Sequence, residues 1–267
     1  MVRIIVAGCA GRMGRRIIRL ALKNKNITIG GVFEHKDHPL VGTDIGTMIG
    51  AGKTNLIVKP DLTHVVDKGD VIIEFTNPSA TVAHVQAALT HKKKMVIGTT
   101  GLSTKEHESI KKAAQQIGIV SAPNMSVGVN LLFKLSHLVA STLRDDYDVE
   151  IVEAHHKFKK DAPSGTALEI ARQVAAGRKI TLSENAIYGR AGFCGERKKG
   201  TVGIHAVRGG DVIGEHTVSF MAEGERIELI HRASSRDAFA KGALVAALFI
   251  SHKKKGLFTM QDVLGIV

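Results

Sequence analysis

The sequence predicts an α/β protein in which a Rossmann-type parallel sheet domain is joined to an α+β domain with an open mixed or antiparallel sheet. Between residues 2 and 122, short apolar runs typical of buried parallel strands alternate with segments of helical periodicity. A glycine-rich turn, residues 8–14, directly follows the first of these runs. After residue 200 the pattern changes to longer segments in which apolar and polar residues alternate, as they do in antiparallel strands.

Length and composition indicate a globular protein of ordinary type. The 267 residues are 44% hydrophobic and 23% charged, which suits one large or two modest domains. The two cysteines, Cys9 and Cys194, cannot form a disulfide framework and favour a reducing compartment. Residues 2–7 have the pattern of a buried strand rather than a secretion signal, and the longest apolar run, residues 242–250, is too short to span a bilayer. We therefore expect a cytoplasmic protein without a membrane segment.

The chain is strongly basic, with a formal net charge of +12 and a pI near 9.8. Such a charge suits nucleic acid, an anionic surface or anionic small molecules. Aromatic residues make up only 4% and tryptophan is absent, so stacking platforms for single strands are scarce. Small anionic ligands are favoured over nucleic acid, and no metal site is expected.

The N-terminal segment has the layout of a dinucleotide-binding unit. A strand at residues 2–7 leads into the glycine turn, a helix with an apolar face follows, and a second strand at residues 27–33 ends at Glu34. In such units glycines let the backbone approach a pyrophosphate, and the acid binds the ribose hydroxyls. The spacing here is G-x-x-G-x-x-G, with Ala10 in place of the usual second glycine. A tight strand-to-helix turn that binds nothing is the alternative.

The residues after Glu34 leave the choice of cofactor open. Glu34 suits the free hydroxyls of NAD, whereas His35 and Lys36 could accept the additional phosphate of NADP. A solvated loop accounts for these two basic residues equally well. Dual use of NADH and NADPH is therefore plausible.

The next part of the chain predicts an open parallel sheet. We expect a loop over residues 37–52, a short strand at 55–58, a short helix at 61–66, strands at 71–75, 95–97 and 118–122, and helices ending near residues 91 and 117. Ser103 and Glu106 have the spacing of a capping box. Turns at 75–76, 98–101 and 122–125 follow strands, and ligands of such sheets bind beyond the carboxyl ends of strands.

The remainder predicts the second domain and a returning helix. A helix at residues 128–143 and a strand at 148–154 come first, and strands at 201–207, 212–222 and 226–233 are separated by turn signals at 209–211 and 223–225. The helix at residues 237–251 is expected to return to the first domain. The boundaries we expect are residues 1–126 with 236–267 for the first domain, and 127–235 for the second.

Residues 153–167 combine two histidines and three lysines with the start of a helix. Either Ser164 or Thr166 could cap this helix, since Thr166 has a glutamate three residues later. A helix N-terminus attracts carboxylate or phosphate, and a histidine can move a proton near neutral pH. The segment is therefore interpreted as a site that binds a small anion and protonates it. A basic surface loop with ordinary capping is the alternative.

Several motifs together resemble the 4-hydroxy-tetrahydrodipicolinate reductases, also called dihydrodipicolinate reductases. The resemblance extends from the first strand to residues 256–258 and is most specific in the block with His-His-x-x-Lys and Asp-Ala-Pro-Ser-Gly-Thr. The segments that carry it are residues 8–14, 98–101, 122–128, 153–159, 161–166 and 214–216. Two positions differ from the family pattern: His35 stands where members that use NADP often carry arginine, and Met125 replaces an aromatic residue.

The resemblance implies roles for individual residues. His155 and Lys159 match the positions of the proton donor, and His156, Ser164, Gly165 and Thr166 match the contacts with substrate. The implied contacts with NADH or NADPH are Gly8, Cys9, Ala10, Gly11, Arg12, Met13, Glu34, His35, Phe75, Gly98, Thr99, Thr100, Ala122, Pro123, Asn124 and Met125.

The implied activity is the NAD(P)H-dependent reduction of a cyclic imine dicarboxylate, in the diaminopimelate route of lysine biosynthesis. The resemblance further implies a homotetramer built by the open sheet of residues 127–235, which would also bind the substrate. Two alternatives remain: another two-domain nicotinamide-dependent dehydrogenase of amino or oxo acids, and a non-catalytic protein that senses the cofactor.

Overall fold

The computed structural model describes residues 1–266, which form two compact units. Unit 1 comprises Met1–Val127 with Arg236–Gly265, and unit 2 comprises Gly128–Ser235. Among the described residues, no helix combines the length and the apolar character needed to cross a membrane.

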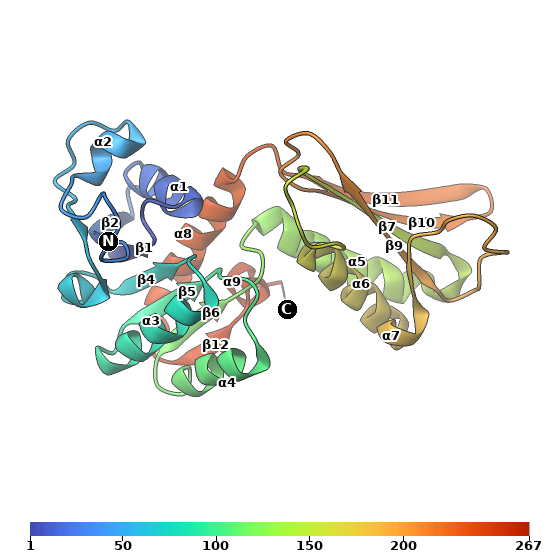
Figure 1. The fold of residues 1–267 in the computed structure, drawn as a ribbon. Coiled ribbons are helices and arrows are strands. Elements are labelled where there is room, and N and C mark those ends of the chain that lie inside the picture. Colours follow the sequence, from blue (N-terminus) through green and yellow to red (C-terminus); the bar gives the residue numbers. More distant parts are fainter. Residues whose placement is uncertain (267) are drawn as a thin grey trace. The chain divides into compact units, whose positions relative to one another are not determined.

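Unit 1 contains a seven-stranded sheet in the order β12-β6-β5-β4-β1-β2-β3, in which every pair of neighbours is parallel (Figure 1). Its strands are β1 (Val2–Ala7), β2 (Ile27–Phe33), β3 (Val58–Lys59), β4 (Val71–Glu74), β5 (Lys94–Ile97), β6 (Gly118–Ser121) and β12 (Gly256–Phe258). Its helices are α1 (Arg12–Ala21), α2 (Ile45–Ile49), α3 (Pro78–Thr90), α4 (Thr104–Ala113), α8 (Asp237–Ser251) and α9 (Met260–Leu264). The predicted Rossmann-type sheet is confirmed.

Both faces of this sheet are buried, which explains the continuous apolar runs in the sequence. Ile4 and Val6 of β1 lie in one core with residues of α1 and α8, and Ile5 and Ala7 lie in a second core with residues of α3 and α4. Since successive residues of a strand point to opposite faces, a strand covered on both sides must be apolar throughout. Helix α8 packs on this sheet, where its apolar residues complete the first core.

Short elements of unit 1 differ from the sequence prediction. Helix α2 lies within the segment predicted to be a loop, where the side chain of Asp44 caps it by accepting the amide of Gly46 at 2.8 Å. The strand predicted at 55–58 is the two-residue β3, and the predicted helix at 61–66 is a pair of 3-10 turns, Leu62–His64 and Val66–Lys68. Strand β12 and helix α9 were not predicted. The capping box of Ser103 and Glu106 is confirmed.

Unit 2 contains a five-stranded mixed sheet in the order β11-β10-β7-β9-β8. Its strands are β7 (Asp148–His155), β8 (Ala186–Tyr188), β9 (Val202–Arg208), β10 (Glu215–Ala222) and β11 (Glu225–Arg232). Its helices are α5 (Val127–Leu143), α6 (Gly165–Arg178) and α7 (Leu182–Asn185). Helices α5 and α6 cover one face of the sheet (Figure 1), where their apolar residues pack on those of β7, β9 and β10.

The topology of unit 2 explains where the sequence prediction was wrong. The turn at 209–211 does not join neighbouring strands, because β7 lies between β9 and β10 and pairs with β9 in parallel and with β10 in antiparallel orientation. The turn at 223–225 does close a hairpin between β10 and β11. Helix α6 is capped by Ser164, whose hydroxyl accepts the amide of Ala167 at 3.1 Å, so that Thr166 lies inside the helix rather than at its cap.

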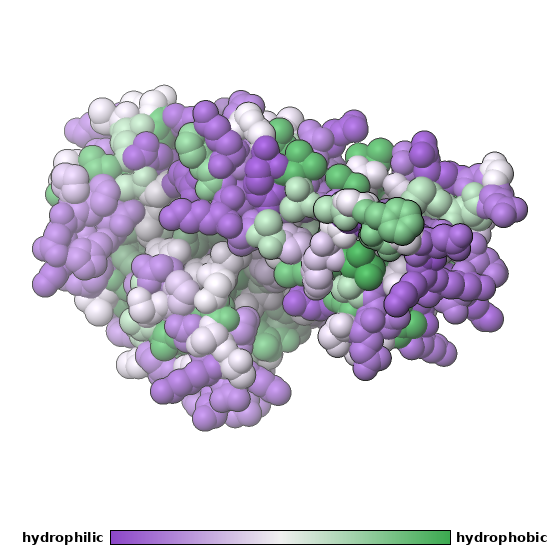
Figure 2. Space-filling view, turned by 45° about the vertical axis from the view of Figure 1, so that its right-hand side comes forward, coloured by the Kyte–Doolittle hydropathy of each residue, from purple (hydrophilic) through white to green (hydrophobic). Residues whose placement is uncertain are grey.

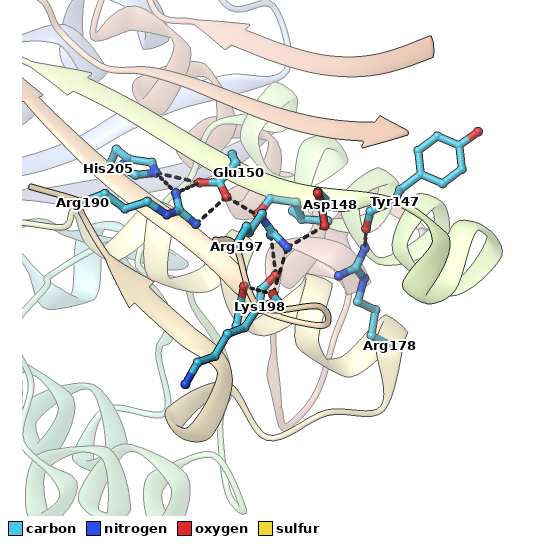
Figure 3. Close-up of polar contacts among 10 residues, drawn as sticks. Tyr147, Asp148, Glu150, Arg178, Arg190, Arg197, Lys198 and His205 are labelled. Carbon is cyan, nitrogen blue, oxygen red and sulfur yellow. Dashed lines mark hydrogen bonds and ion pairs between the residues drawn. The ribbon is translucent and has the colours of Figure 1, made fainter. Parts of the chain in front are cut away.

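The uncovered face of the sheet in unit 2 carries both apolar and charged side chains. Val152, Val207 and Ile230 lie on this face by strand alternation and pairing and are 41%, 51% and 47% exposed. Figure 2 shows apolar side chains gathered among hydrophilic ones on the visible surface of this unit. Glu150 lies on the same face, where it accepts hydrogen bonds from Arg190, Arg197 and His205 (Figure 3).

Helix α8 packs closely on Met125, in the segment that follows β6, and this contact provides a test of the fold of unit 1. A Cβ atom on Gly242 would lie 1.7 Å from the carbonyl oxygen of Met125. We expect Gly242→Ala to lower the free energy of unfolding by about 1–3 kcal/mol, as other overpacked cores do. Urea denaturation measures this change. Lys241→Ala, an exposed change in the same helix, should stay within about 0.5 kcal/mol, and equal stability of both variants would contradict the packing described.

Candidate active site

The turn between β1 and α1 is shaped to admit a ligand close to the backbone. Gly8 has a φ of +59°, and a Cβ atom there would lie 2.9 Å from Cγ2 of Thr76. Gly11 occupies the N-cap of α1, and its position is not capped by a side chain. The helix therefore presents its N-terminal amides beside a turn whose two glycines leave the backbone accessible, an arrangement that suits a pyrophosphate.

Glu34 lies beside this turn at the end of β2. Its Oε1 atom accepts the amide of Ala10 at 2.9 Å, and its Oε2 atom accepts the amide of His35 at 3.2 Å. A depression of about 220 Å³ opens next to it, and its lining includes Gly8, Glu34, His35, Thr76, Asn77 and His84. A carboxylate at the rim of a depression next to a glycine turn fits the ribose of a dinucleotide.

A buried carboxylate that sequence reasoning missed lies beneath the depression. Glu74 is fully buried at the end of β4, where it accepts the amide of Thr76 at 2.9 Å, the hydroxyl of the same residue, and Nδ1–H of His84 at 2.5 Å. The ring of His84 packs edge-on against Phe33 at 5.0 Å. Glu74 thereby fixes Thr76 against Gly8. The signal in the sequence is a single acid at the end of an otherwise apolar strand.

Several residues predicted to contact the cofactor have side chains that face the core. Cys9, Ala122 and Met125 are 0%, 6% and 1% exposed and belong to the core with α8. Burial raises the pKa of Cys9 to about 12, so its thiol stays protonated. Thr99 is buried and its hydroxyl accepts a hydrogen bond from the hydroxyl of Thr81 at 2.8 Å, whereas Thr100 and Pro123 are exposed. The buried members of this set can therefore offer a ligand only their backbone atoms.

In unit 2, Glu153 of β7 is fully buried and lies at the centre of a network of hydrogen bonds. Its Oε1 accepts the amide of Ser164 at 2.9 Å and an N–H of Arg208 at 2.7 Å. Its Oε2 accepts Nδ1–H of His155 at 2.5 Å and a second N–H of Arg208 at 2.8 Å. Burial alone would raise the pKa of Glu153, but the hydrogen bonds from His155, Arg208 and Ser164 outweigh burial and lower the pKa to about 2.

His155 is oriented by this contact. Its side chain is 12% exposed, and its Nδ1 is occupied by Glu153. The other ring nitrogen, Nε2, faces Gly214, where a Cβ atom would lie only 3.0 Å away. The ring thus has Nδ1 held by Glu153, while Nε2 lies beside a glycine, where any larger residue would crowd it.

The start of α6 lies beside His155. No atom lies within 4 Å of the position that a Cβ on Gly165 would occupy, so the first turn of this helix is open. His156 precedes it in the loop, and among the described residues its buried Nδ1 has no hydrogen-bond partner. Lys159, in the same loop, is 21% exposed on its side chain, and its Nζ lies 2.8 Å and 2.9 Å from the carboxylate oxygens of Asp161.

A further histidine, His216, contacts both Ser164 and the ring of His155. His216 is 3% exposed, its Nε2 is 3.2 Å from the hydroxyl of Ser164, and its ring meets that of His155 edge-on at 5.3 Å. Burial, followed by the charge of His155, lowers the pKa of His216 to about 3. This histidine therefore stays neutral beside one that can carry a proton.

The structure brings His155, Ser164 and Gly165 close together through Glu153, and it adds Glu153, Arg208 and His216 to the predicted set. Strand periodicity placed Glu153 on the same face as His155, so that this signal was present in the sequence. The positions of Arg208 and His216 depend on the insertion of β7 between β9 and β10, and no local pattern reveals it. Within residues 1–266 no group of three or more histidine, cysteine or acidic side chains could hold a metal ion.

The lowered pKa of His216 predicts a loss of stability in acid. The unfolded chain takes up a proton near the ordinary pKa of 6.5, whereas the folded chain resists it down to about 3. Stability from this residue is therefore lost as the pH falls from 6.5 towards 3, by up to about 1.4 kcal/mol per pH unit. When the pH is lowered from 6.5 to 5, the free energy of unfolding, measured by urea denaturation, should fall by up to about 2 kcal/mol more in the wild type than in His216→Gln. Equal losses would show that His216 is not kept neutral.

Comparisons with known proteins agree with this geometry. The model of the N-terminal part of dihydrodipicolinate reductase matches residues 2–125, and the model of the C-terminal part matches residues 128–264. The 4-hydroxy-tetrahydrodipicolinate reductase of Syntrophus aciditrophicus (strain SB) is 52% identical over 99% of both chains. The enzyme of the same name from Hahella chejuensis (strain KCTC 2396) is 48% identical over 100% of both chains.

A solved structure leads to the same family. A dihydrodipicolinate reductase from Paenisporosarcina sp. TG-14, with dipicolinate bound, is similar with a TM-score of 0.76 and 26% identity over 98% of both chains. The matches cover both units, and they do not favour the other dehydrogenase or the cofactor sensor. The chain belongs to the 4-hydroxy-tetrahydrodipicolinate reductase family, whose members are NAD(P)H-dependent oxidoreductases.

Proposed function

We propose that the chain reduces 4-hydroxy-tetrahydrodipicolinate, or dihydrodipicolinate, to tetrahydrodipicolinate with NADH or NADPH, in the diaminopimelate route of lysine biosynthesis. The observation that carries the proposal is the pairing of an oriented imidazole, His155, with the open N-terminus of α6. A dicarboxylate needs a site for an anion, and its reduction needs a proton. The names of the relatives support the same reaction.

The cofactor fits the residues of unit 1. The backbone from Gly8 to Met13 would hold the pyrophosphate, and Glu34 would bind a ribose hydroxyl, while His35 and Lys36 would meet the additional phosphate of NADPH. Residues 98–100 and 122–125 follow β5 and β6, whose carboxyl ends lie at the same edge of the sheet as those of β4 and β1. The bound cofactor supplies the hydride.

The substrate fits the residues of unit 2. One carboxylate would accept amide hydrogen bonds at Gly165 and Thr166, where the helix end carries partial positive charge. Ser164 keeps this turn of the helix in place as its N-cap. His156 and Lys159 would complete the binding of the dicarboxylate.

Protonation would complete the reduction. The 4-hydroxy compound would first lose water to give the conjugated imine, dihydrodipicolinate. Hydride addition to this imine leaves a carbanion-like enamine, and a proton on the neighbouring carbon completes the saturation of one double bond. The imidazolium of His155 would deliver this proton from Nε2, the nitrogen that Glu153 leaves free. Lys159 is the second candidate, and its pairing with Asp161 keeps its ammonium group within the site.

We further propose a cytoplasmic homotetramer built by the uncovered sheet face of unit 2. Val152, Val207 and Ile230 expose apolar surface there, and such patches on a sheet commonly mark protein contacts. The two cysteines are unpaired, as expected in a reducing compartment.

The assembly is tested by analytical ultracentrifugation. The wild type should sediment as a tetramer, and Ile230→Asp should shift it to smaller species, because a charge would be buried in the contact. Val245→Asp replaces an exposed valine of α8, outside this face, and should leave the tetramer intact. A wild type that sediments as a monomer would refute the proposal.

The donor is tested by steady-state oxidation of NADH and of NADPH with freshly generated substrate. His155→Ala should lower kcat by about 10²–10⁴, the usual effect of removing a general acid. Lys159→Ala should raise KM for the substrate and lower kcat if it shares the donor role. Lys160→Ala removes an exposed lysine of the same loop and should change neither constant by more than about twofold. Near-normal turnover of both site variants would rule out the assignment.

A further inference from the structure

We propose that Glu153 is the positioning residue of the site, because a single buried carboxylate sets both the tautomer of the proton donor and the start of the anion-binding helix. This inference rests on the proposed function and concerns how the site is held in its working geometry.

The hydrogen bonds of Glu153 are complete. A carboxylate offers about four lone-pair positions, and Glu153 receives four donors, one from His155, one from Ser164 and two from Arg208. These donors come from β7, the start of α6 and β9. Since each acceptor position is used, movement of any one of these elements would leave a buried charge with an unfilled position, and such a loss typically costs several kcal/mol.

The contact with His155 determines which nitrogen can exchange a proton. An ionised carboxylate only accepts hydrogen bonds, so Nδ1 of His155 must carry its hydrogen in both protonation states of the ring. The titrating proton is therefore the one on Nε2. After the proton has left Nε2, the neutral ring remains in the same hydrogen bond to Glu153.

The contact with Ser164 links the same carboxylate to the substrate carboxylate. The amide of Ser164 points to Glu153, and its hydroxyl accepts the amide of Ala167, so the first turn of α6 is held from both sides. Arg208 also donates to the carbonyl of Asp161, the residue that pairs with Lys159. The donor and the anion site are thus held by one group of charges.

Glu150 provides a matched control on the same strand. It lies on the opposite face of β7, where it is bound by Arg190, Arg197 and His205, and its hydrogen bonds outweigh burial and lower its pKa to about 2, as those of Glu153 do (Figure 3). The two glutamates therefore share partner types and charge state, but only Glu153 touches a residue of the site.

The first experiment compares Glu153→Gln with Glu150→Gln. The side-chain amide that the first substitution introduces would donate to Nδ1 of His155, which prevents the ring from holding protons on both nitrogens. We expect kcat to fall by about 10²–10⁴, as on loss of a general acid, and the affinity for dipicolinate, measured by calorimetry, to fall. Glu150→Gln should keep kcat within about twofold, and thermal unfolding with ultracentrifugation should verify that both variants are folded and equally assembled.

A double variant separates positioning from general destabilisation. If Glu153 acts through His155, Glu153→Gln combined with His155→Ala should lower kcat no further than His155→Ala alone, because residues that act as a unit are not additive. Additive losses, or a kcat of Glu153→Gln close to that of Glu150→Gln, would overturn the inference while leaving the reductase function in place. A wild type that does not oxidise either cofactor with the substrate would overturn both.

Discussion

The site in unit 2 depends on one buried carboxylate whose charge is fully compensated. A charge without solvent is costly unless its partners are well placed, and Glu153 has partners on its own strand, at the start of α6 and on β9. This requirement makes the carboxylate a stringent constraint on geometry. The helix N-terminus and the imidazole are ordinary features by themselves, and they become a site because the same group fixes both.

The neutral state of the neighbouring histidine follows from the same arrangement. His216 lies opposite Glu153 in the register of β7 and β10 and reaches Ser164 with its Nε2. Burial keeps the pKa of His216 low, so that its ring stays neutral. The imidazole of His216 therefore serves as a neutral hydrogen-bonding support for Ser164 beside the ring of His155.

The sequence was sufficient for those parts of the fold that local pattern determines. Apolar runs and glycine turns predicted the strands and the binding turn of unit 1, since strands covered on both faces are apolar and few residues tolerate the backbone of Gly8. Short elements such as α2 and β12 lack a periodic signal and were missed. In unit 2, β7 pairs with strands that come more than forty residues later in the chain, and no pattern of neighbouring residues encodes this pairing. The sequence therefore did not predict the role of Arg208. It placed Glu153 on the strand, but it did not reveal the four hydrogen bonds that this carboxylate accepts.

The tautomer of His155 is the most direct test of this account, and nitrogen NMR of the protein labelled with ¹⁵N in its histidines measures it. Assignment through His155→Ala would identify the ring signals, and a titration would follow both nitrogens. The account predicts that Nδ1 keeps its hydrogen throughout, with a strongly deshielded proton from the bond to Glu153, while Nε2 alone titrates. A neutral ring that carries its hydrogen on Nε2 would contradict it.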